Sequence, residues 1–192
     1  MASSGQGTAS RPGGRSARVV AAVHQAVAEL ISERGPDQVS IPAVAARAGV
    51  NATSIYRRWG DVRQLLVSVA ESRLTPDTLP PNTGSLRQDL VEWADDLLEH
   101  ISAPEGVVSL RTVVNFGADD DVRQRCLRKR ADQVELILER ARARGGVVPS
   151  PDQVMDHVLA PLYFRVMFAV EATDSSYAHA LVDELLSGNG RK

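Results

Sequence analysis

Residues 37–66 read DQVSIPAVAARAGVNATSIYRRWGDVRQLL, and their pattern predicts two short helices joined by a tight turn. Ser40 and Asn51 each stand where a side-chain oxygen can accept a hydrogen bond from the first turn of a helix. Gly49 is expected to end the first helix, because glycine adopts the left-handed backbone conformation without steric cost. This pattern is typical of a helix-turn-helix, although an αα-hairpin inside a helical bundle shares it.

The residue types, beyond their spacing, resemble those of a known family. Residues 48–59, AGVNATSIYRRW, closely resemble the recognition segment of TetR-family transcriptional regulators. Residues 33–35 and 39–41 are similar to the end of that family's first helix and the start of its second. The resemblance covers about residues 18–68 and implies an all-α protein. In such a protein an N-terminal three-helix DNA-binding domain precedes a helical domain for ligand binding and dimerisation.

Composition independently favours an all-α globular protein. Of the 192 residues, 43% are hydrophobic and 24% charged, and the low aromatic content of 4% argues against an all-β sandwich. The single cysteine, Cys126, excludes an intramolecular disulfide and fits a reducing compartment. The sequence has no apolar run of the ~20 residues that cross a bilayer, and no apolar signal-peptide segment near Met1. We therefore expect a cytoplasmic protein without a membrane partner.

Charge is distributed unevenly along the chain. Residues 1–75 carry nine arginines and five acidic residues, whereas the remainder carries thirteen basic and nineteen acidic residues. A basic N-terminal part joined to an acidic body is typical of a DNA-binding domain fused to a domain with another role. We expect a disordered tail over residues 1–15, a helix-turn-helix domain with a linking fourth helix over residues 16–74, and a helical effector-binding and dimerisation domain over residues 75–192.

The last two predicted helices are expected to form a dimer interface. Residues 154–172 are apolar on nearly every side, so a second buried face should meet another subunit, and Pro161 should kink this helix. Residues 161–165, PLYFR, also resemble a stretch near the dimer interface of a large TetR subgroup. By this resemblance the two helices pair with their symmetry mates as a four-helix bundle. The expected interface residues are Leu162, Phe164, Val166, Phe168, Tyr177, Leu181 and Leu185.

The resemblance also implies which residues contact double-stranded DNA. Tyr56 is expected to donate its hydroxyl to a phosphate, and Arg57 is able to make a bidentate contact to guanine. Ile55 and Trp59 are expected to hold the recognition helix in the core. The complete set of expected DNA contacts is Ser40, Asn51, Ala52, Thr53, Ser54, Tyr56, Arg57, Arg58 and Arg63.

One position departs from the family pattern. Val62 stands where the family usually has a lysine that contacts phosphate. Arg63 follows immediately, but its side chain points about 100° further round the helix. Whether Arg63 replaces that contact is therefore open.

The sequence contains no recognisable catalytic or cofactor-binding motif. It has no glycine-rich phosphate-binding motif and no HExxH, and its four histidines lack metal-ligand spacing. The basic residues between positions 123 and 130 share a helix with three aspartates, so we interpret them as a solvated helical face and not as a second nucleic-acid site. We expect neither an enzyme nor a bound cofactor or metal.

These observations favour a ligand-responsive transcriptional regulator. We expect a homodimeric repressor that binds a near-palindromic operator and is released by a small, largely apolar molecule. Activation in place of repression is an alternative. A second alternative is a helical scaffold or partner-binding protein with weakened DNA binding, which the departure at Val62 keeps open. The candidate effector contacts are Trp93, Phe116, Met155 and His157.

Overall fold

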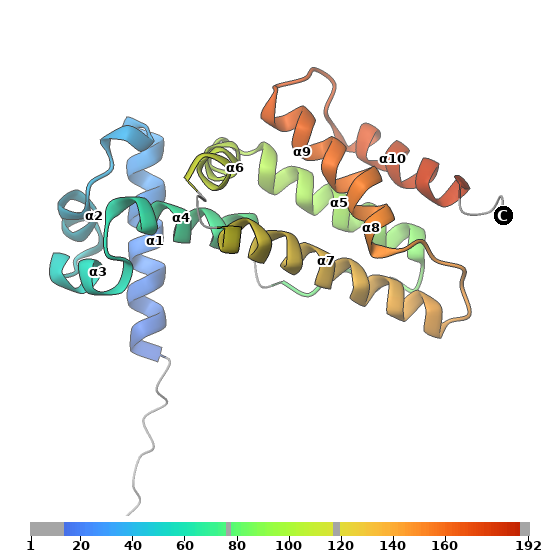
Figure 1. Cartoon of the computed structure of the whole chain (residues 1–192), viewed down its shortest axis with the longest axis horizontal. Coiled ribbons are helices and arrows are strands. Elements are labelled where there is room, and N and C mark those ends of the chain that lie inside the picture. The colour runs from blue at the N-terminus through green and yellow to red at the C-terminus, as the bar shows by residue number, and fades with distance from the viewer. Residues whose placement is uncertain (1–13, 76–77, 117–119, 189–192) are drawn as a thin grey trace, which may run out of the picture. The chain divides into compact units, whose positions relative to one another are not determined.

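The computed structural model describes residues 14–75, 78–116 and 120–188, and every regular element in these ranges is a helix (Figure 1). The all-α class expected from the sequence is therefore confirmed. The chain divides into two compact units, an N-terminal unit up to Val62 and a C-terminal unit from Arg63 onward. Most of the tail expected over residues 1–15 lies outside the described residues, but the first helix already begins at Gly14.

The N-terminal unit contains a long helix and two short ones. Buried side chains of the long helix, among them Val23 and Val27, share this unit with the buried Val44 and Ile55 of the short helices. The first helix contacts the second, and the second contacts the third. The elements are α1 (Gly14–Arg34), the 3₁₀ helix η1 (Pro36–Gln38), α2 (Ile41–Ala48) and α3 (Ala52–Trp59).

An ion-pair cluster fixes α2 against α1 at the surface of this unit. Arg47 donates to both carboxylate oxygens of Glu33 at 2.8 Å and to Glu29 at 3.1 Å. The bonds from Arg47 lower the pKa of Glu33, while a hydrogen bond from Gln25 is the largest of the causes that lower the pKa of Glu29. The bidentate geometry sets the orientation of α2, although solvent screening keeps its effect on stability small.

The C-terminal unit is a bundle arranged around one central helix, α5, which contacts α6, α7, α9 and α10. Its fully buried side chains Leu90, Leu97 and Ile101 belong to one core cluster that also includes Ile137 and Leu162. Helix α4, the expected linking helix, groups with this unit. The elements are α4 (Val62–Leu74), α5 (Leu86–Ser102), α6 (Pro104–Phe116), α7 (Asp120–Ala143), α8 (Pro151–Val154), the π-helical turn η2 (Met155–Leu159), α9 (Ala160–Met167) and α10 (Ser175–Gly188).

Pro161 disturbs the helix that contains it, and the disturbance takes the form of a π-helical turn. A proline cannot donate to the carbonyl four residues earlier, which here belongs to His157. The chain widens over Met155–Leu159, where the N–H of Ala160 donates to the carbonyl of Met155. Helices α8, η2 and α9 therefore follow one another without a loop.

The same helix ends earlier than the sequence pattern indicates. Its apolar residues continue to position 172, but α9 ends at Met167. Ala169 takes a left-handed conformation with φ of 51°, and the N–H of Val170 donates back to the carbonyl of Arg165 at 2.9 Å. This is the hydrogen-bonding pattern of a Schellman helix end, here formed without glycine.

One arginine of α7 corrects the expectation of a solvated basic face. Arg130 is only 5% exposed, whereas Arg128 and Lys129 are exposed. The reason is its position, because Cys126, Arg130 and Val134 follow one another at spacings of four residues and all three are buried. The stripe of buried residues on α7 therefore includes one cation.

Gly106 marks a close contact between the end of α5 and the start of α6. A Cβ atom at this position would lie 1.9 Å from the carbonyl oxygen of His100 and 2.9 Å from the Cα of Ile101. Both neighbours are backbone atoms, so no side chain can move aside. The glycine is needed here because of space and not because of its backbone angles.

We therefore predict that Gly106→Ala destabilises the protein by about 1–3 kcal/mol, the usual range for overpacking. Urea unfolding followed by circular dichroism measures this loss. The matched control is Gly188→Ala at the end of α10, where a Cβ would meet nothing within 4 Å. Equal free energies of unfolding for the two variants would contradict the steric argument.

Candidate nucleic-acid interface

Three residues that the sequence predicts as helix boundaries begin and end the two short helices α2 and α3. The Oγ of Ser40 accepts from the backbone N–H of Ala43 at 3.4 Å, and the Oδ1 of Asn51 accepts from that of Thr53 at 2.8 Å. Gly49, between the helices, has φ of 66° and ψ of 32°, which is the left-handed conformation. Both predicted N-caps and the glycine turn are confirmed.

Helix α3 separates into a buried anchor and a polar outer face. Ile55 is 0% exposed, whereas the next residue, Tyr56, is 49% exposed. Asn51, Thr53, Arg57 and Arg58 are also exposed, and Ala52 and Ser54 are half-buried. Ser40 lies exposed at the start of α2. Eight of the nine expected DNA contacts thus belong to the N-terminal unit.

The ninth expected contact, Arg63, belongs to a different unit. It is exposed in the first turn of α4, which groups with the C-terminal unit. Val62, the position of the missing lysine, is half-buried at the junction of the two units.

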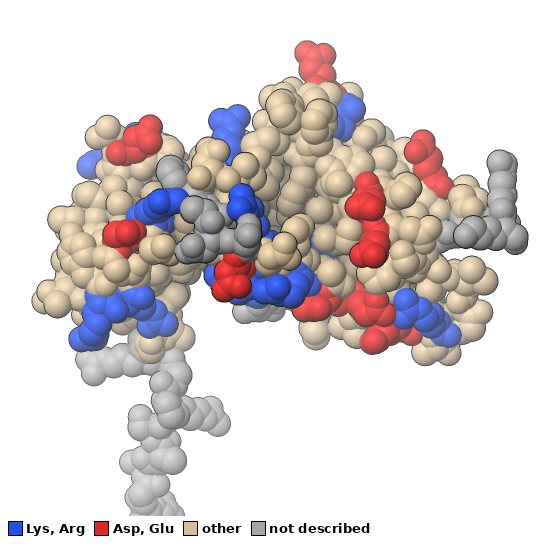
Figure 2. All heavy atoms as spheres, viewed as in Figure 1, with Lys and Arg blue, Asp and Glu red and all other residues tan. Residues whose placement is uncertain are grey.

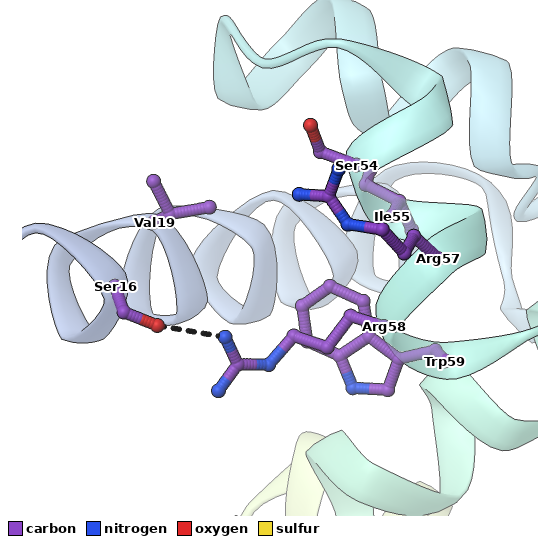
Figure 3. A pocket seen from close by; sticks show the side chains of 7 residues that line it. All are labelled: Ser16, Val19, Ser54, Ile55, Arg57, Arg58 and Trp59. Atoms are coloured by element: carbon purple, nitrogen blue, oxygen red, sulfur yellow. Dashed lines mark hydrogen bonds between the residues drawn. The ribbon is translucent and has the colours of Figure 1, made fainter.

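Arg58 is oriented by two residues rather than extending freely into solvent. Its Nη1 donates to the Oγ of Ser16 on α1 at 2.9 Å, and its guanidinium carbon lies 5.5 Å from the centre of the Trp59 ring (Figure 3). Trp59 itself is half-buried and lies 6.1 Å from the ring of His24, so it is only partly a core residue. A cation over an aromatic ring with one fixed hydrogen bond is well prepared to meet a phosphate.

Ser16 is a site residue that the sequence analysis missed. It stands in the first turns of α1, and a groove of about 630 Å³ lies between that end of α1 and α3. Figure 3 shows Arg58 reaching across this groove toward Ser16. The available signal was the position of Ser16 just before the apolar stripe of α1. The groove is lined by Ser16, Val19, Ser54, Ile55, Arg57, Arg58 and Trp59.

Positive charge gathers on the same end of the N-terminal unit. Figure 2 shows blue side chains over α3 and the first turns of α1. Among the side chains of these two segments that the structure describes, Arg18, Arg57 and Arg58 are exposed arginines. A surface with exposed arginines, a tyrosine hydroxyl and a helix of polar residues suits a phosphate backbone and the edges of bases.

Neither metal nor membrane sites are found in the part of the chain that the structure describes. No group of three or more His, Cys, Asp or Glu residues there could hold a metal ion. None of the described helices is long and apolar enough to cross a membrane.

The four candidate effector contacts are not brought together. Trp93 is buried and its Nε1 donates to the Oε1 of Gln133 at 3.3 Å, while Met155 is half-buried against the core. His157 is exposed, with its Nδ1 3.1 Å from the carbonyl oxygen of Gln153, so it points away from the interior. The side chain of Phe116 lies outside the described residues.

The expected dimer residues divide into two groups. Leu162 and Leu185 are buried in the core of their own unit, so the surface open to a partner is smaller than the sequence indicates. Phe164 and Phe168 are 60% and 67% exposed, and their ring centres lie 4.7 Å apart. The half-buried members of the set are Val166, Tyr177 and Leu181.

Comparisons with known proteins agree with this architecture. Residues 25–69 match the family model of bacterial regulatory proteins of the tetR family, and residues 80–185 match that of the tetracyclin repressor-like C-terminal domain. The HTH-type transcriptional regulator AqdR of Rhodococcus erythropolis is 34% identical over 179 residues, which cover 91% of this chain and 86% of the relative. YdeS of Bacillus subtilis, also an HTH-type transcriptional regulator, is 28% identical over 175 residues, 87% of each chain.

Solved structures give the same result. A TetR-family transcriptional regulator from Mesorhizobium loti aligns with a TM-score of 0.68 at 18% identity, over 91% of this chain and 98% of the other. The TetR-family regulator SCO0332 aligns with a TM-score of 0.67 at 26% identity, over 89% and 98% of the two chains. These relatives are DNA-binding regulators and not enzymes. On the two family models and the relatives together, the chain belongs to the TetR family of transcriptional regulators.

Proposed function

We propose that this TetR-family regulator is a homodimeric repressor that binds a near-palindromic operator and leaves it when a small, largely apolar molecule binds the C-terminal unit. The observation that carries the DNA-binding part is the two-sided character of α3, with Ile55 buried and Tyr56 and Arg57 exposed. A helix anchored on one face can place the other in the major groove.

The exposed residues of the N-terminal unit divide into positioning and reading roles. Tyr56 donates its hydroxyl to a phosphate, and Arg58, held by Ser16, meets a second phosphate. Arg57 is the candidate for a bidentate contact to guanine, and Thr53 is exposed one turn before it. Phosphate contacts set the register, and the latter two residues select the sequence.

Asn51 has a double role in this proposal. Its Oδ1 is already used to cap α3, which leaves the amide N–H groups as donors. The two amide N–H groups are suited to a phosphate oxygen or to an acceptor on a base edge. Asn51 therefore links the stability of α3 to DNA recognition.

The dimer is supported by the exposed aromatic pair on α9. A pair of phenylalanines in ring contact, with each residue more than half exposed, is unusual on a monomer's surface. Two copies related by a two-fold axis would cover these rings. Such a dimer presents two recognition helices, and a near-palindromic operator follows from its symmetry.

Release by an effector requires a molecule that prefers one spacing of the two DNA-binding units over the other. The apolar core of the C-terminal unit supports a largely apolar effector, because its side chains would surround a molecule bound among these helices. The alternative of a helical scaffold with weakened DNA binding predicts the opposite result in a DNA-binding assay, because it has no need for Tyr56 or Arg57.

The first experiment is fluorescence anisotropy with duplexes from the DNA that flanks the coding region, followed by random-sequence selection if none binds. We predict salt-sensitive binding that Tyr56→Phe weakens about tenfold, the effect of one hydrogen bond to a charged group. Arg57→Ala should weaken specific binding by about 1–3 kcal/mol and relax the sequence preference at one position.

The matched control is Arg87→Ala, which removes an exposed arginine from the C-terminal unit, where it pairs with Asp183 at 2.7 Å. It should bind DNA like the wild type. Binding no tighter than to random duplexes, even after selection, would support the scaffold alternative and contradict the repressor.

The double role of Asn51 makes a second prediction. Asn51→Ala removes the cap and should lower the free energy of unfolding by about 1 kcal/mol as well as the DNA affinity. Asn51→Asp keeps the capping oxygen and favours the helix dipole, so it should retain stability while its charge repels phosphate and lowers DNA affinity. Thermal unfolding and anisotropy separate the two effects, and wild-type affinity in the aspartate variant would refute the proposed contact.

The dimer proposal predicts the effect of removing the aromatic pair. Light scattering after size-exclusion chromatography should give a dimer for the wild type and a single chain for the double variant Phe164→Ser, Phe168→Ser. Val147→Ser is the control, because Val147 is equally apolar and 84% exposed but lies in the loop after α7. A double variant that remains dimeric would place the interface elsewhere.

A further inference from the structure

Arg130 is a buried cation without an anionic partner among the described residues. Arg130 lies on α7, and the residue is 5% exposed. Its Nη1 donates to the amide oxygen of Gln133 at 3.0 Å, and its Nη2 donates to the backbone carbonyl of Leu74. Its Nε, also buried, has no hydrogen-bond partner. The charge is therefore surrounded by neutral groups.

Two other charged residues of this unit, the buried Asp89 and the half-buried Arg125, each have partners of opposite charge. The buried carboxylate of Asp89 accepts from the N–H and hydroxyl of Thr83 at 2.6 and 2.7 Å and lies 3.5 Å from Arg144. Arg125, five residues before Arg130, donates to both carboxylate oxygens of Glu71 at 2.8 and 3.1 Å. Burying an unpaired guanidinium is costly, and an orphaned N–H group in a native structure needs an explanation.

The surroundings of Arg130 form a small polar cluster in an apolar core. The amide oxygen of Gln133 accepts from both Arg130 and the indole of Trp93. The hydroxyl group of Tyr163, a residue of α9, lies against Arg130. Burial raises the pKa of Tyr163, so this hydroxyl stays protonated. Cys126, one turn before Arg130, completes the buried face of α7. Donors from three helices, α5, α7 and α9, thus lie close together in the interior.

We propose that Arg130 binds the anionic group of the effector, and that the effector is an apolar carboxylic acid. This inference rests on the proposed ligand response and narrows its chemistry. A carboxylate can accept two parallel bonds from the Nε edge of a guanidinium, which is the edge that contains the unpartnered donor. Tyr163 can supply a further hydrogen bond, and the surrounding core suits a hydrocarbon body.

The same contact offers a route for the response. Leu74 is the last residue of α4, so its carbonyl is one that the helix itself cannot satisfy. A carboxylate on the guanidinium competes with this carbonyl for Nη2 and releases the end of α4. Helix α4 starts at Val62, the last residue of the DNA-binding unit. A loss of the hydrogen bond that holds the end of α4 is therefore transmitted along this helix to the DNA-binding unit.

The test compares carboxylates with their neutral primary amides on the full chain. The pairs are benzoate and benzamide, octanoate and octanamide, 1-naphthoate and 1-naphthamide, and indole-3-acetate and indole-3-acetamide. We expect at least one acid to raise the Tm of the wild type by about 5 °C or more at about a hundredfold excess over its Kd. The corresponding amide should have a much smaller effect.

Variants of α7 assign the effect to one side chain. Arg130→Met should abolish the shift caused by the acid, whereas Arg125→Met, which removes an arginine already paired with Glu71, should retain it. Arg130→Lys keeps the charge without the planar fork, and we expect it to fold and to bind the acid at least tenfold more weakly. This variant tests the proposal even if the methionine variant does not fold.

The proposal is overturned if no acid exceeds its amide, or if the shift persists in both Arg130 variants. DNA binding without any acid is measured on the same proteins by anisotropy. Wild-type DNA binding without an acid-specific shift removes this inference and leaves the repressor proposal intact, whereas absent DNA binding removes the repressor proposal itself.

Discussion

The DNA-binding surface depends on the burial of a single side chain. Helix α3 has eight residues, which is too short for a helix to be stable alone in water. Ile55 is its one buried residue, and the Asn51 cap satisfies the first turn. Because the anchor occupies so little of the helix, the other residues are free to be chosen for DNA. The structure thus combines a minimal buried face with a large polar face, which a longer amphipathic helix could not do as fully.

The parts of this arrangement that were predictable from sequence are local ones. The helix caps depend only on the capping residue itself: Ser40 and Asn51 each supply a side-chain oxygen, and Gly49 has no side chain to oppose the left-handed conformation. These residue types cap helices in the same way in other proteins. The contact between Arg58 and Ser16 spans 42 residues, so no local pattern encodes it. Family resemblance indicates which residues to expect at the DNA, but not the side chains that position them.

The structure of the C-terminal unit differs from the sequence-based prediction at two places, and both differences have the same origin. The apolar pattern of residues 154–172 does not indicate where the helix ends. The end is set by the backbone, because Ala169 takes a left-handed conformation and the N–H of Val170 donates to the carbonyl of Arg165. The charge of Arg130 and its neighbours predicts an exposed face, whereas its spacing from Cys126 and Val134 places it on the buried side of α7. Periodicity was the better guide there, because a side chain's direction is fixed by the helix and not by its polarity.

Helix α4 is where the two functions meet. It is covalently continuous with the DNA-binding unit, yet its contacts place it in the C-terminal unit. Arg125 pairs with Glu71 in the last turn of α4, and Arg130 binds the carbonyl at its end, so both attachments come from α7. The first is an ion pair that is already satisfied, whereas the second leaves a buried donor unmet. Of these two contacts, the second is the one for which an anionic ligand can compete, since displacing the first would leave Glu71 without the arginine that pairs with it.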